Sequence, residues 1–117
     1  MKSANLEFGR YGEKLAMRYL KQKGYRILNH HWTCRWGEID IVASKDEKLV
    51  FCEVKTRTTN VLESFHRPQQ KRLWRSIQFY LSRSCLDRAF QVDFIGVEFG
   101  NNVPKITHLQ NVLEDLD

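Results

Sequence analysis

The sequence predicts an α/β fold in which helices flank a central sheet, with the element order αβββαββ. The first segment of the 117 residues has apolar residues at helical spacing. Three short runs rich in β-branched and aromatic residues follow, separated by polar turns. A second helical segment and two further strand-like runs complete the chain, whose length suits a single domain spanning 1–117.

The first helix is expected from Asn5 to Lys23, and Gly24 is a suitable residue to end it. Its inward stripe consists of Leu6, Glu13, Ala16, Met17 and Leu20. Glu13 stands out because a carboxylate on an inward face needs a partner. Either it bonds a backbone amide or an arginine at the stripe's margin, or it points at a metal ion. Gly9 and Gly12 would let another backbone or a phosphate come close.

Three strands are expected next, forming an antiparallel meander over Tyr25 to Thr33, Glu38 to Ala43 and Leu49 to Lys55. Cys34 to Gly37 makes the first turn of this meander, and Glu38 follows on the same face as Asp40. The adjacent His30 and His31 point to opposite faces of a strand, so they are expected to be surface or packed residues rather than joint metal ligands.

The third strand places charged residues on one face and apolar residues on the other. Alternation puts Glu53 and Lys55 together and leaves the opposite face to Val50, Cys52 and Val54. With the right register, Asp40 stands across from Glu53. Two carboxylates in a half-buried site repel each other, and Mg²⁺, which prefers hard oxygen ligands, would relieve that repulsion. The alternative is a structural ion pair in which Lys55 neutralises one of the carboxylates.

The second half of the chain is expected to supply the contacts to a substrate. Thr56 to Phe65 is interpreted as a polar, mobile connection, with Arg57 as a phosphate contact. Pro68 suits the first turn of the next helix, whose outer face is basic. The core stripe of this helix consists of Leu73, Ile77, Tyr80 and Leu81, its basic face includes Lys71 and Arg75, and Trp74 is expected in the core.

Two strands end the predicted fold. The first covers Ala89 to Phe99 and carries an inward carboxylate, Asp93, which is expected to bond backbone amides or an arginine. The second covers Val103 to Leu109, after a turn at residues 100–102, and a short acidic tail follows over 110–117.

Composition narrows the class of function. A formal net charge of +5 and a pI of about 9.3 suit a polyanionic partner such as nucleic acid. The three cysteines form no C-x-x-C motif, and an odd number of cysteines fits a reducing cytoplasm. The sequence has neither a secretory signal nor an apolar run of membrane-spanning length, so a cytoplasmic protein is expected.

The motifs GRYGEKLA, GEIDIV and FCEVKTR resemble those of the PD-(D/E)xK nuclease superfamily and, more closely, of the YraN-like family of small bacterial proteins, which are similar to Holliday junction resolvases. The resemblance covers about 8–97. It implies the three-layer, restriction-endonuclease-like fold and a Mg²⁺-dependent endonuclease, with Mn²⁺ as a substitute, acting on DNA that is branched or otherwise structured. Resolvase-like relatives cut as two-fold dimers, so a homodimer is one assembly that the resemblance implies.

Residue by residue, the resemblance implies metal ligation by Asp40, Glu53, the Val54 carbonyl and Glu13. Lys55 would position the attacking water or stabilise the transition state. The nucleic-acid contacts would be Arg57, Gln69, Lys71 and Arg75. The usual proline of the motif is Ile39 here, and glutamines at 69 and 91 replace a lysine and an arginine that the family often has. These departures leave two alternatives open, a nucleic-acid-binding protein that keeps the fold without cutting, and an assembly factor that binds RNA or protein.

Overall fold

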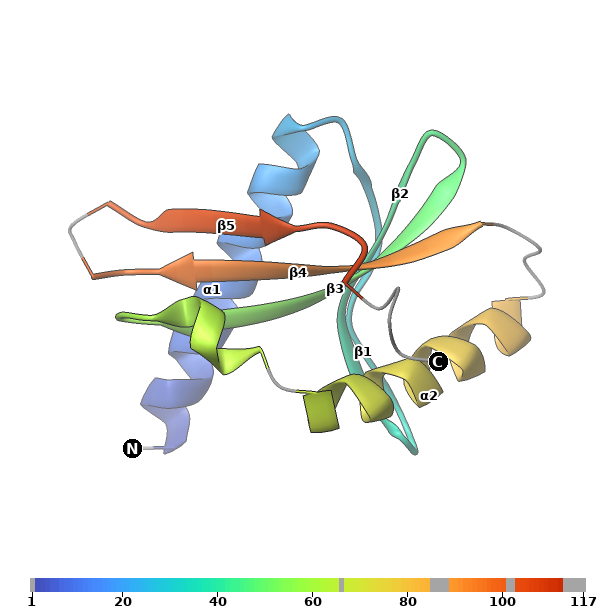
Figure 1. Cartoon of the computed structure of the whole chain (residues 1–117), viewed down its shortest axis with the longest axis horizontal. Helices are drawn as coiled ribbons and strands as arrows, with labels where there is room; N and C mark the ends of the chain where they lie inside the picture. Colours follow the sequence, from blue (N-terminus) through green and yellow to red (C-terminus); the bar gives the residue numbers. More distant parts are fainter. Residues whose placement is uncertain (1, 66, 85–88, 101–102, 113–117) are drawn as a thin grey trace.

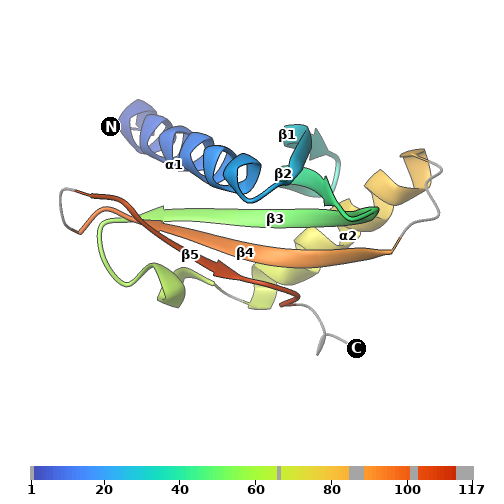
Figure 2. The ribbon, with the colours of Figure 1, turned by 90° about the horizontal axis from the view of Figure 1, so that it is seen from above.

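A five-stranded mixed sheet forms the centre of the molecule, with one long helix on each side (Figures 1 and 2). The computed structural model describes residues 2–65, 67–84, 89–100 and 103–112, and within these it describes only the backbone of 2–4 and 67–70. The elements are α1 (Lys2–Gln22), β1 (Arg26–Cys34), β2 (Gly37–Lys45), β3 (Lys48–Arg57), the 3-10 helix η1 (Val61–Ser64), α2 (Arg67–Ser84), β4 (Phe90–Glu98) and β5 (Lys105–Leu109).

The strands lie in the spatial order β1-β2-β3-β4-β5. The first three form the predicted antiparallel meander, and β5 pairs antiparallel with β4. The central pair, β3 and β4, is parallel, because the chain crosses over through η1 and α2 between these strands. The predicted order αβββαββ and the layered α/β architecture are therefore confirmed.

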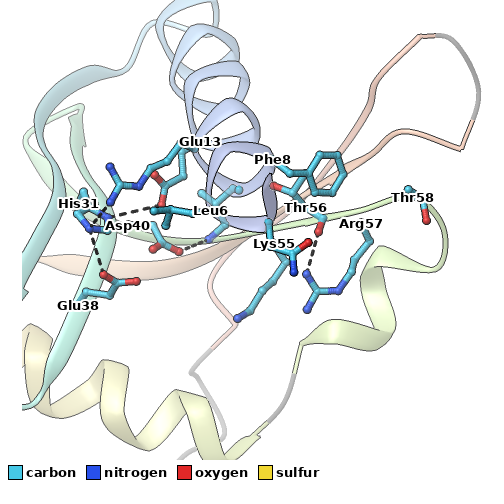
Figure 3. Close-up of a pocket in the computed structure, with 14 residues that line it drawn as sticks. Leu6, Phe8, Glu13, His31, Glu38, Asp40, Lys55, Thr56, Arg57 and Thr58 are labelled. Carbon is cyan, nitrogen blue, oxygen red and sulfur yellow. Dashed lines mark hydrogen bonds and ion pairs between the residues drawn. The ribbon is translucent and has the colours of Figure 1, made fainter. Parts of the chain in front are cut away.

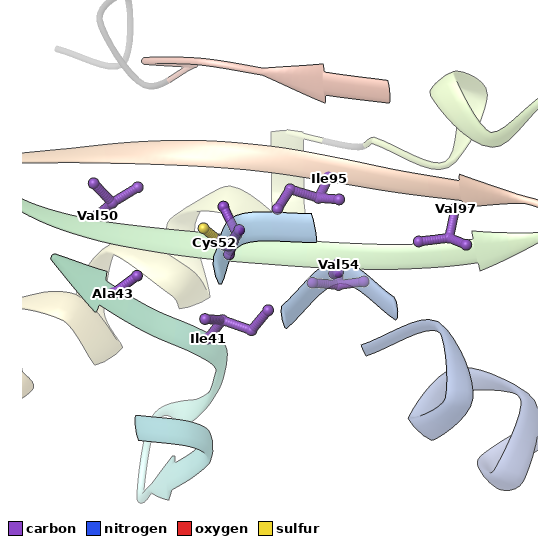
Figure 4. Packing of buried hydrophobic residues seen from close by; sticks show 9 residues of the cluster. Ile41, Ala43, Val50, Cys52, Val54, Ile95 and Val97 are labelled. Atoms are coloured by element: carbon purple, nitrogen blue, oxygen red, sulfur yellow. The ribbon is translucent and has the colours of Figure 1, made fainter. Parts of the chain in front are cut away.

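Alternation along β3 divides the core into two layers. Val50, Cys52 and Val54 face α1 and pack with residues of β2 and β4, such as Ile41 and Ile95 (Figure 4). Side chains of the opposite face pack beneath α2, and this second cluster includes Leu49, Phe51, Val92, Leu73, Ile77 and Tyr80. Since both faces of β3 are covered, this strand reads as an almost continuous apolar run that is interrupted by Glu53.

The two ends of α1 differ in how far they match the sequence. At its C-terminus Gly24 has φ +92, and the Tyr25 N–H donates to the Leu20 carbonyl, so the predicted glycine stop is confirmed. Nearer the N-terminus the inward stripe was wrong for Leu6, which is 58% exposed, because α1 extends beyond the edge of the core here. Gly12 is needed for close packing, since a Cβ there would overlap the Thr56 side chain.

The segment after Lys55 contains more regular structure than the predicted polar connection. β3 continues to Arg57, and η1 buries Val61 against Gly96 of β4, where a Cβ would lie 2.8 Å from a Val61 methyl carbon. Trp74 was wrong as a core residue, since it is 38% exposed beside Phe90. Most of the predicted 100–102 turn and of the acidic tail lie outside the described residues.

No helix in the described part of the chain combines the length and apolar character that a membrane crossing requires.

Candidate active site

The sheet opens between β2 and β3 at the position of Asp40. The last pair in the ladder is Ile41 with Cys52, and one more step would pair Asp40 with Glu53. Instead the Val54 N–H donates to Asp40 Oδ2 at 2.7 Å, so the side chain takes the place of a backbone acceptor. Ile39 packs beneath α2 although Ile41 packs beneath α1, so the regular alternation of β2 is broken between them. The register of β2 and β3 would bring Asp40 opposite Glu53 at the next step, and the strands separate at this position.

β1 is also distorted beside this opening. His31 has φ 50, a left-handed conformation that a strand residue rarely adopts. Its ring lies among charged groups, with Nε2 3.4 Å from Glu38 Oε2 and 3.0 Å from Arg10 Nη2 (Figure 3). Its Nδ1 lies 3.9 Å from Glu13 Oε1. The distortion therefore turns His31 towards the carboxylates of α1 and β2.

Two clefts meet at the opening. The larger, of about 580 Å³, lies between the N-terminal half of α1 and the ends of β2 and β3 (Figure 3). The smaller, of about 240 Å³, lies on the α2 side and is lined by Glu53, Arg72 and Leu73 among others. Glu38, Asp40 and Lys55 line both clefts. Glu13 thus approaches from the α1 side and Glu53 from the α2 side, with Asp40 between them.

Burial and crowding oppose ionisation of these carboxylates. Desolvation, and to a smaller extent the charges of Glu13, Glu38 and Glu53, raise the pKa of Asp40 from 3.8 to about 7, against the lowering effect of the Val54 N–H. Desolvation also raises the pKa of Glu13, which His31, Arg10 and a hydrogen bond with Asp40 counteract. The opening therefore disfavours the ionised forms of Asp40 and Glu13, chiefly because their carboxylates are withdrawn from water.

The donors suit a hard divalent cation in their chemistry. Carboxylate and carbonyl oxygens are the ligands that Mg²⁺ takes, and a buried carboxylate surrounded by others gains most from a nearby positive charge. Within the described residues, however, no three His, Cys, Asp or Glu side chains are grouped closely enough to hold an ion. Asp40 is engaged by the Val54 N–H, and Glu53 Oε1 lies 3.6 Å from Lys55 Nζ, as the ion-pair alternative expects.

The structure places the sequence-predicted residues unequally around the clefts. Glu13, Asp40, Val54 and Lys55 line the larger cleft with Arg57, whose Nη1 donates to the Thr56 carbonyl at 2.8 Å. Glu53 lines the smaller one. Lys71 and Arg75 are exposed on α2 outside both clefts. The side chain of Gln69 lies outside the described residues.

Three residues of the clefts were missed by the sequence analysis. Arg10 lies three positions before Glu13 on a helix, a spacing that indicates one face. Arg72 lines the smaller cleft, whereas the sequence analysis named its neighbour Lys71 as the nucleic-acid contact. Adjacent helical residues point about 100° apart, so only the packing of α2 shows which of the two faces the cleft. His31 had no such signal, because its place depends on a left-handed residue within a strand.

Fold and site together define a small α/β protein with a carboxylate-lined opening in a mixed five-stranded sheet. The family model described as uncharacterised protein family UPF0102 matches residues 12–97. A UPF0102 protein of Campylobacter hominis is 38% identical over 91% of this chain and 93% of its own length, and one of Carboxydothermus hydrogenoformans is 39% identical over 92% and 96%. The chain belongs to the UPF0102 family.

Proposed function

We propose that this protein is a Mg²⁺-dependent endonuclease that hydrolyses phosphodiester bonds in DNA, including branched or otherwise structured DNA. The observation that carries the proposal is the opening between β2 and β3, which gathers Asp40 and Glu53 with Lys55 at the junction of two clefts. A purely structural ion pair needs one carboxylate and one ammonium. Here four carboxylates lie around the opening, and desolvation together with the charges of the other three raises the pKa of Asp40.

Asp40 and Glu53 would hold the cation, with Glu13 and the Val54 carbonyl as further ligands. A bound divalent cation would polarise a phosphoryl oxygen, lower the pKa of the attacking water and offset charge on the leaving oxygen. Lys55, which lines both clefts, would stabilise the charge that develops on the phosphate.

Cations around the clefts would hold the DNA backbone. Arg10 and Arg57 line the larger cleft and Arg72 lines the smaller one, so positive charge lies on both sides of the opening. Together with the net charge of +5, these contacts would make binding weaken steeply as salt concentration rises.

Plasmid and branched DNA incubated with Mg²⁺ or Mn²⁺, and in parallel with a chelator, test the proposal. Asp40→Asn and Glu53→Gln each remove one charge and should slow cleavage by about 10³-fold. DNA binding should remain, because the arginines are untouched. Asp46→Asn and Glu47→Gln are matched controls in the exposed turn at the other end of the same two strands, and they should cut at the wild-type rate.

The rival is a protein that binds nucleic acid without cutting it, which the ion pair between Lys55 and Glu53 favours. A salt-sensitive gel shift without metal-dependent products would support that rival. Wild-type cleavage by both the Asp40 and the Glu53 variants would show that the active site lies elsewhere.

A further inference from the structure

An exposed tryptophan lies beside the smaller cleft, at the tip of the β1–β2 hairpin. Trp36 is 40% exposed and directly precedes Gly37, which lines that cleft. The guanidinium of Arg35 lies 4.8 Å from the centre of the Trp36 ring, and that of Arg75 of α2 lies 5.6 Å from it. Among the described residues no ion pair joins either guanidinium to an acidic side chain. The hairpin tip therefore presents an aromatic ring with two positive charges close to it.

This arrangement continues along one side of α2. Arg72, Arg75, Phe79 and Arg83 recur at intervals of three and four residues, which puts them on a single stripe. The stripe runs for about 16 Å at the rise of an α-helix. At the far end of the stripe, a separate groove of about 440 Å³ is lined by Arg35, Trp32, Phe79 and Arg83. We call the surface formed by Arg35, Trp36, Arg72, Arg75, Phe79 and Arg83 the stacking surface.

Its composition distinguishes between two kinds of nucleic acid. Phosphates of a duplex need only cations, because the base faces are hidden within the stack. An exposed aromatic ring with guanidinium groups over it offers planes on which unpaired bases stack, and the guanidinium groups also bind phosphate. The stacking surface adjoins the smaller cleft through Gly37 and Arg72.

We propose that the stacking surface binds an unpaired DNA strand that leads to or from the cleft. Where the proposed nuclease function holds, the substrate is then DNA in which a single-stranded segment flanks the scissile bond, as at a branch or flap. Trp36 is the residue that determines this preference, and Arg35 and Arg75 hold the adjoining phosphates.

Binding measured in a chelating buffer tests this proposal apart from cleavage. Fluorescence anisotropy would compare a labelled oligothymidylate with a blunt duplex of the same length. Trp36→Ala should weaken binding of the oligothymidylate about tenfold, in the range that stacking of one base contributes. Affinity for the duplex should change less than twofold. Trp74→Ala is the matched control, because Trp74 is 38% exposed on another side of α2, and it should alter neither affinity.

A second measurement needs no variant. An abasic strand keeps the phosphates of the oligothymidylate but lacks bases, so the wild-type protein should bind it about tenfold more weakly, and Trp36→Ala should cause no further loss. Equal losses of duplex and single-strand affinity in Trp36→Ala, or unchanged affinity for the abasic strand, would overturn the proposal. Tighter binding of oligouridylate than of oligothymidylate would overturn the choice of DNA. If Trp36 contributes to single-strand binding but no metal-dependent cleavage is detected, this inference stands and the proposed nuclease activity is wrong.

Discussion

Two aspartates on either side of β3, the buried Asp93 and the half-buried Asp40, show how differently one fold treats the same side chain. Asp93 of β4 pairs in register with Cys52, while Asp40 of β2 lies one step beyond the last pair on the other side. Asp93 is fully buried yet well partnered, by His108 Nε2 at 2.7 Å, Gln91 Nε2 at 2.9 Å and the Asn111 N–H at 3.0 Å. Asp40 has the Val54 N–H and is otherwise surrounded by carboxylates.

Asp93 is the end of a series of polar contacts between side chains. Tyr19 of α1 bonds His108 Nδ1 at 3.0 Å, and the other ring nitrogen of His108 meets Asp93. This chain connects α1, β4 and β5, so the carboxylate stabilises the fold and needs no ligand. At Asp40 the same type of group lies at an opening, next to clefts. A carboxylate inside a fold therefore indicates function when its neighbours repel its charge, and structure when they satisfy it.

The largest effect is expected from replacing Asp93, the aspartate with the structural role. Asp93→Asn removes the charge that faces His108, and we expect it to lower the free energy of unfolding by about 3 kcal/mol, because the partners are left buried without it. Asp40→Asn should leave stability at pH 8 unchanged or raise it, since it removes a repelled charge. Chemical denaturation of the two variants checks this. An equal loss of unfolding free energy in both variants would contradict the different roles assigned to Asp93 and Asp40.

A smaller effect concerns pH. The unfolded Asp40 carboxyl loses its proton near pH 3.8, whereas the folded one keeps it to about pH 7. Between these values the folded state binds more protons, so the contribution of Asp40 to stability falls as pH rises through the window and stays low above it. We expect wild type to lose stability relative to Asp40→Asn as pH rises from 4 to 8, with a slope of up to about 1.4 kcal/mol per pH unit. Parallel pH profiles of the two proteins would contradict the raised pKa.

The smallest effect tests the proposed cation. At a concentration about ten times its dissociation constant, Mn²⁺ should stabilise the wild-type protein by about 1.4 kcal/mol. The shift should be larger at pH 8 than at pH 5.5, because the cation competes with the proton on Asp40. Thermal melts with and without Mn²⁺ measure this shift, and Asp40→Asn should reduce it. An equal shift in that variant would place the cation at another site.

Much of the fold was predictable because local patterns decide it. The helical stripe ending at Gly24 and the alternation that puts Glu53 and Lys55 on one face of β3 follow from spacing alone. The register of Asp40 stayed a condition, because the pairing of two strands is decided only when they meet in the sheet. The inward position of Asp93 also followed from spacing, but its main partner was not predictable, because His108 comes from a strand that pairs only in the folded chain.

The order of elements, the two faces of β3 and the acidic and basic residues at the end of the meander follow from the amino-acid sequence, since the spacing of side chains along a strand or helix depends only on backbone geometry. Only the tertiary structure decided that β2 and β3 separate at Asp40, that a left-handed His31 turns into the cleft, and that Trp36 meets Arg75. Each depends on how distant segments pack against one another, and no local pattern records it.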